Sequence, residues 1–102
     1  MYLSYNLCNL ITNYILLIMK TMTCKQLGGS CDKEFHAATF EEMAELSKNH
    51  GMEMFKSADK DHLKAMQNMQ ELMNSPEAME TWFQQKREEF NVLPLDSKSL
   101  HE

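Results

Sequence analysis

Five residues of metal-binding types lie in the middle of the chain: Cys24, Cys31, His36, His50 and His62. Thiolate sulfur and imidazole nitrogen are ligands that zinc prefers in proteins, usually four around one ion. Cys24 and Cys31 are separated by six residues, a wider gap than the about two to four that are common in zinc sites. The spacing alone favours a metal site only weakly. Which of these residues can bind the same ion depends on the strands and helices in which they lie.

Two short strands are predicted on either side of a double glycine, over residues 20–26 and 31–37. Side chains alternate in both runs in the way that is typical of strands with one buried face. Gly28-Gly29 suits a tight turn that needs positive φ, so the two strands should form an antiparallel hairpin. A hairpin alone is marginally stable, and this one must pack against the rest of the chain.

The alternation predicts which candidate ligands share a face of the hairpin. With the turn at the glycines, Lys33 lies opposite Cys24, and Cys31 is the diagonal neighbour of Cys24 on the same face. Diagonal neighbours have Cβ atoms about 7 Å apart, so both thiols can reach one ion after a modest adjustment. His36 falls on the opposite face and reaches the thiols only if a bulge intervenes.

A first helix should follow the hairpin, because Thr39 and Glu42 have the spacing of a capping box. Apolar residues recur at helical spacing from Phe40 onward, and His50 falls on the same side. That side should meet the hairpin, which makes His50 a third candidate ligand. Gly51 marks either the end of this helix or a weak point within it, since glycine costs about 1 kcal/mol in a helix interior.

Two further helices are predicted, one starting near Ser57 or Asp59 and one at Ser75-Pro76, a typical cap and first helical position. The fold class is therefore α+β, with an N-terminal antiparallel hairpin packed on two to three helices in the order β-β-α-α-α. We expect a single small domain over residues 19–93. Pro94 ends the helical pattern, so residues 94–102 should form a disordered tail.

The predicted metal ligands are Cys24, Cys31 and His50, with His36 or His62 as the fourth. Zinc or another divalent transition metal fits this donor set. In the alternative interpretation both cysteines are core residues, because free cysteine is often buried and acts as a small hydrophobe. A reversible disulfide is a third interpretation, but no helix begins after Cys24 to stabilise a thiolate.

The sequence contains no motif of an enzyme, such as a phosphate-binding loop, a nucleophile elbow or HExxH.

The sequence contains ten methionines. Met66, Met69 and Met73 recur at helical spacing, and we expect such a stripe to belong to the core. If it were exposed, it would form a surface for a protein partner.

The net charge is −5, from 15 acidic and 10 basic residues. Phosphate backbones are bound by basic surfaces, so we expect no nucleic-acid partner.

The three cysteines are an odd number, which argues against a secreted disulfide scaffold and favours the cytoplasm.

Residues 1–18 carry no charged side chain and differ in composition from the rest of the chain. We expect translation to start at Met19, with the upstream residues added by a mis-assigned start. The alternatives are a hydrophobic membrane anchor, which would make the membrane a partner, and an additional packed helix. Asparagines interrupt the segment, whereas a spanning helix needs about 20 mainly apolar residues.

Residues 19–55 resemble a small bacterial family of domains of unknown function whose members are described as predicted small metal-binding proteins. The resemblance rests on Cys24, Gly28-Gly29, Cys31-Asp32, Thr39-x-x-Glu42 and His50-Gly51. It implies a small metal-binding protein and supports Met19 as the start. Because no catalytic motif is present, we expect this protein to be non-catalytic. Many relatives carry two histidines on the first helix, whereas this chain has only His50 there, which leaves His36 or His62 to complete the shell. The alternative function is a structural or protein-interaction module with Cys and Met in its core.

Overall fold

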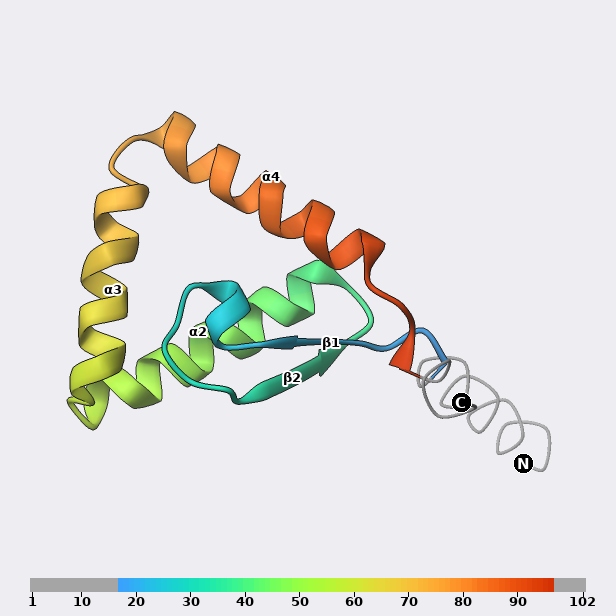
Figure 1. Cartoon of the computed structure of the whole chain (residues 1–102), viewed down its shortest axis with the longest axis horizontal. Coiled ribbons are helices and arrows are strands. Elements are labelled where there is room, and N and C mark those ends of the chain that lie inside the picture. Colours follow the sequence, from blue (N-terminus) through green and yellow to red (C-terminus); the bar gives the residue numbers. More distant parts are fainter. Residues whose placement is uncertain (1–16, 97–102) are drawn as a thin grey trace, which may run out of the picture.

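The computed structural model describes residues 17–96, and Figure 1 shows how their elements are arranged. Two strands, β1 (Lys20–Thr23) and β2 (Glu34–Ala37), are joined by a loop that contains a short 3₁₀ helix, η1 (Lys25–Leu27). The helices α2 (Phe40–Lys56), α3 (Lys60–Leu72) and α4 (Pro76–Val92) follow. The predicted α+β class and the order β-β-α-α-α are therefore confirmed.

The two strands are antiparallel, with Met22 opposite Phe35 and Thr21 opposite His36. Met22 and Phe35 are buried, while His36 is exposed on the other face, as the alternation predicts. The same register places Cys24 opposite Lys33, whose carbonyl accepts a hydrogen bond from the Cys24 N–H at 2.8 Å.

The strands are nevertheless shorter than the predicted 20–26 and 31–37, because the chain turns into a loop at Cys24. The N–H groups of Leu27 and Gly29 both donate to the carbonyl oxygen of Cys24, at 3.1 and 2.8 Å. The bond from Leu27, together with that from the Gly28 N–H to the Lys25 carbonyl at 3.1 Å, forms η1 where we expected the strand to continue. Gly28 ends η1 with a φ of 96°, a left-handed conformation that favours glycine.

Each helix begins at a residue whose side chain caps it. Thr39, Asp59 and Ser75 accept hydrogen bonds from the backbone N–H groups of Glu42, His62 and Ala78, respectively. These are the starts that the sequence predicts, including Asp59 of the two alternatives for the second helix. Gly51 lies inside α2, which continues to Lys56.

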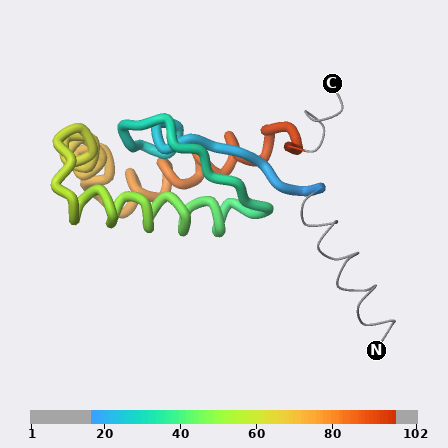
Figure 2. Tube along the Cα trace, turned by 90° about the horizontal axis from the view of Figure 1, so that it is seen from below, coloured from blue at the N-terminus to red at the C-terminus, as the bar shows by residue number. Residues whose placement is uncertain are grey.

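The core lies between the buried face of the hairpin and α2. Figure 2 shows the hairpin lying over α2, with α3 seen end-on at the far end of that helix. The buried apolar residues of the core are Met22, Cys24, Leu27, Phe35, Ala37, Phe40, Met43 and Phe90. Phe90 is the one contribution of α4 to this group, so much of α3 and α4 lies outside the core.

The helices α2, α3 and α4 form three sides of an open triangle, and the chain after α4 returns to the start of β1 (Figure 1). The N–H of Asp96 donates to the carbonyl oxygen of Met19 at 2.8 Å, so the first residues of the predicted tail 94–102 lie against β1. The rest of that tail and most of the predicted segment 1–18 lie outside the described residues. Among residues 17–96, no helix has the length and hydropathy that crossing a membrane requires.

Candidate metal centre

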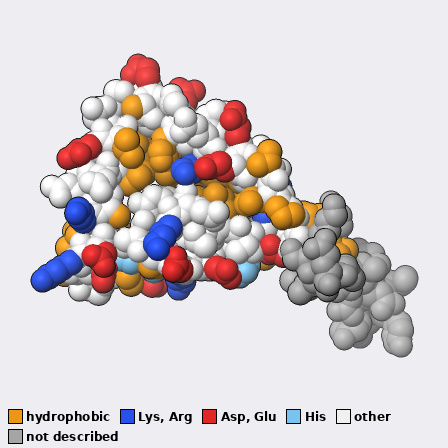
Figure 3. Space-filling model, in the orientation of Figure 1, with side chains coloured by type: hydrophobic (Ala, Val, Ile, Leu, Met, Phe, Trp, Pro, Cys, Tyr) orange, Lys and Arg blue, Asp and Glu red, His pale blue; other side chains and the backbone are white. Residues whose placement is uncertain are grey.

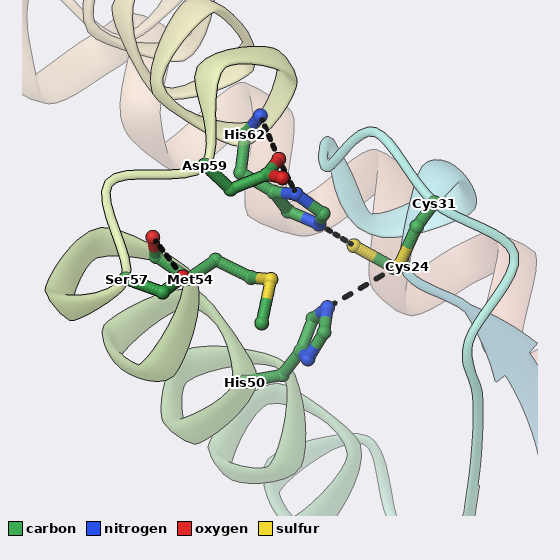
Figure 4. A network of polar contacts seen from close by, with 7 residues as sticks. All are labelled: Cys24, Cys31, His50, Met54, Ser57, Asp59 and His62. Carbon is green, nitrogen blue, oxygen red and sulfur yellow. Dashed lines mark hydrogen bonds and ion pairs between the residues drawn. The ribbon is translucent and has the colours of Figure 1, made fainter.

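Four of the predicted candidate ligands lie together where the loop after β1 meets α2 and α3. Cys24, Cys31, His50 and His62 each offer one ligand atom, and these atoms all lie within 4.8 Å of one another. Figure 4 shows the two thiols approaching from the loop, His50 from α2 and His62 from the first turn of α3. The structure thus brings together donors from three separate parts of the chain.

The distances resemble those within a tetrahedral zinc shell. Cys24 Sγ lies 3.6 Å from His62 Nε2, and Cys31 Sγ lies 3.3 Å from His50 Nε2. Around a tetrahedral zinc ion with the usual bond lengths, neighbouring ligand atoms are about 3.3–3.8 Å apart. Both sulfur–nitrogen pairs fall in this range, so small side-chain shifts would complete the shell.

The Cys24 thiol is accommodated by the glycine turn. A Cβ on Gly29 would lie 2.1 Å from Cys24 Sγ, which is a direct overlap with the sulfur. A Cβ on Gly28 would lie 2.7 Å from Met69 Sδ, so this glycine allows the loop to approach α3 closely. The double glycine therefore serves the site as well as the turn.

Asp59 orients His62. Its Oδ2 accepts hydrogen bonds from both the backbone N–H of His62, at 3.0 Å, and Nδ1–H of the same residue, at 2.7 Å. The proton on Nδ1 leaves Nε2 free to act as a ligand toward the thiols. The hydrogen bond to Asp59 raises the pKa of His62 and lowers that of the Asp59 carboxyl.

His50 is held by packing. It is 7% exposed, and its ring contacts that of Phe35 edge to face at a centroid distance of 5.7 Å. Burial lowers its pKa, which favours the neutral imidazole that a metal needs. Its Nδ1 is buried and has no hydrogen-bond partner among the described residues, so Nε2 is the nitrogen that takes part in the cluster.

The two thiols have different environments. Burial raises the pKa of Cys24. Burial also acts to raise the pKa of Cys31, but the backbone N–H of Lys33 and the nearby imidazole of His62 favour the thiolate more strongly, so this pKa is lowered. Neither cysteine is in a disulfide. Cys31 is the thiol that forms a thiolate more readily, and Cys24 is the one more dependent on a bound cation.

His36 takes no part in the cluster. Its Nδ1 lies 2.7 Å from Thr21 Oγ1 and 3.4 Å from Asp96 Oδ2, on the exposed face of the hairpin. Of the two alternatives for the fourth position, the structure therefore places His62 beside the thiols and His36 away from them.

Asp59 and Gly29 also belong to the site, although the sequence predicts only a helix cap for Asp59 and a turn for Gly29. The pattern Asp59-x-x-His62 could have predicted the contact between Asp59 and His62, because the side chain of a helix cap lies beside the residue three positions later in the sequence. The overlap of a Gly29 side chain with the thiol follows from the η1 geometry, which the sequence did not predict.

No family model matches the chain, and comparisons with curated proteins and with solved structures find no similar protein. What the structure defines is a small α+β domain with a cluster of two cysteines and two histidines that is compatible with a metal site.

Proposed function

We propose that this protein is a small zinc-binding protein in which Cys24, Cys31, His50 and His62 hold the ion. The observation that carries the proposal is the convergence of four ligand atoms within 4.8 Å from the loop and two helices. Two sulfur and two nitrogen donors in a tetrahedral arrangement are typical of structural zinc sites.

The ion would stabilise the fold. Cys24 and His62 are 38 residues apart in sequence, so an ion between them joins the hairpin to the start of α3. The described part of the chain has only eight buried apolar residues, a small core for a domain. Structural zinc contributes about 10–16 kcal/mol of apparent binding free energy in zinc-finger peptides, which is large compared with the stability of a small domain.

The proposed role is non-catalytic. Four protein ligands fill a tetrahedral zinc shell, whereas catalytic zinc keeps a position open for water or substrate. The resemblance of residues 19–55 to predicted small metal-binding proteins supports the same function, and we propose the cytoplasm as its location because both thiols are free.

Elemental analysis of the purified full chain tests the proposal. We expect about one zinc per chain, and a melting temperature that falls when a chelator removes the ion. Cys31→Ser should lose the zinc, whereas Cys8→Ser, which removes the third cysteine, should keep it. A chain whose melting temperature responds neither to zinc nor to chelator would overturn the proposal.

A further inference from the structure

A large cavity lies inside the triangle formed by α2, α3 and α4. Its volume is about 710 Å³, and residues of all three helices and of the loop after β1 line it. Cavities that bind small molecules typically have volumes of about 300–1,000 Å³. Figure 3 shows hydrophobic side chains gathered along the inner edges of α3 and α4, around this hollow.

The lining is mainly apolar and adaptable. Met66, Met69, Met73 and Met79 contribute to it, together with Trp82 and Phe83. None of these belongs to the buried core, and Met79 and Phe83 are 45% and 40% exposed. The expectation that the stripe Met66, Met69 and Met73 is core is therefore not met. Flexible methionines suit a surface that must fit ligands of varied shape.

Apart from the candidate metal ligands Cys24, His50 and His62, the lining has few ionisable side chains. The chain has 15 acidic residues, yet none of the Asp and Glu residues within 17–96 lines the cavity, and Lys48 is the one Lys or Arg of this range that does. Lys48 lines the cavity and is exposed to solvent on α2, so this residue belongs to the rim of the cavity. None of the ion pairs found among residues 17–96 involves Lys48. The cavity thus combines an apolar interior with a free cation at its edge.

We propose that this cavity binds an apolar carboxylate of the fatty-acid class. The hydrocarbon chain would lie against the methionines and Trp82, and the carboxylate would pair with Lys48. Charge complementarity favours this ligand over a cationic or neutral amphiphile of the same length. The cavity borders the proposed zinc centre, because Cys24, His50 and His62 also line it. The inference goes beyond the metal function in that the proposed contacts come from side chains of α2, α3 and α4 and not from the ion.

The chain contains a single tryptophan, and it lines the cavity, so its fluorescence reports binding directly. We would titrate the zinc-loaded full chain with dodecanoate below its micelle concentration. The expected result is a saturable change that fits one site, with weaker binding of dodecanol and weakest binding of dodecyltrimethylammonium. Lys48→Glu should weaken dodecanoate binding by at least about threefold. Lys64→Glu, the same change at an exposed position of α3 outside the cavity, should leave it unchanged.

Gly51 lines the cavity, and a larger side chain at this position would narrow it. A Cβ at Gly51 would have Met66 Cε as its nearest neighbour, at 3.9 Å, which is ordinary contact distance. Gly51→Leu should raise the melting temperature by about 4 °C or more, because leucine is a better helix former, and should weaken dodecanoate binding more than tenfold. Gly51→Ala should raise the melting temperature similarly and keep binding.

Zinc content is measured in every sample, so a failure of the metal site is distinguished from a failure of the cavity. The proposal is overturned if dodecanoate gives no saturable fluorescence change in zinc-loaded protein. It is also overturned if the cationic amphiphile binds as well as dodecanoate, or if Gly51→Leu binds dodecanoate like the unaltered chain.

Discussion

Replacing Asp59 with asparagine tests how the site positions its ligands. The Asp59 carboxylate accepts the Nδ1 proton of His62 at 2.7 Å and also caps α3 through the His62 N–H. Asparagine is as good a helix cap as aspartate, so Asp59→Asn should preserve the start of α3. It removes only the negative charge that orients the imidazole and makes it a stronger donor.

The expected loss of zinc affinity is about tenfold. Removing the partner of a metal-bound histidine typically costs about 10–100-fold in affinity. The Asp59 side chain is 44% exposed, so water screens part of its effect, and the amide oxygen can still accept the Nδ1 proton. The lower end of the range therefore applies, which corresponds to about 1.4 kcal/mol.

Competition with a chromophoric zinc chelator measures this difference. Asp61→Asn is the matched control, because it removes the same charge from the first turn of α3 at an exposed position. It should change the affinity by less than the Asp59 variant. If Asp59→Asn and Asp61→Asn bound zinc equally well, the orienting role of Asp59 would be wrong.

Three further predictions concern the same site. Gly29→Ala should displace the Cys24 sulfur, because the added Cβ would lie 2.1 Å from it, and should lower both zinc affinity and melting temperature. His36→Gln should keep the zinc and His62→Gln should lose it in elemental analysis, and the opposite pattern would contradict the ligand assignment. In metal-free protein, the raised pKa of His62 stabilises the fold below about pH 6.5 and ceases to do so as the pH rises through the folded pKa. The melting-temperature difference between the unaltered chain and Asp59→Asn should therefore be larger in acidic than in alkaline buffer, and an equal difference in both would refute the linkage.

Local signals predicted much of the fold. Capping residues set the helix starts at Thr39, Asp59 and Ser75, and all three caps are present. Strand alternation placed Cys24 on the inner face and His36 on the outer face, and the register agrees. These features depend on neighbours within a few residues, so the sequence contains the information that they need.

The remaining features depend on how the elements pack. Whether His36 or His62 would meet the thiols depended on the position of α3, which no local pattern determines. The loop after Cys24 forms η1 instead of a longer strand, because the N–H groups of Leu27 and Gly28 donate to the carbonyl groups of Cys24 and Lys25. Helical spacing placed Met66 on an apolar stripe but could not show that the stripe lines a cavity.

X-ray absorption at the zinc edge of the zinc-loaded full chain tests the central claim most directly. A site formed by Cys24, Cys31, His50 and His62 predicts two sulfur ligands at about 2.3 Å and two nitrogen ligands at about 2.0–2.1 Å. A shell made only of oxygen and nitrogen, or protein that retains no zinc, would contradict the claim.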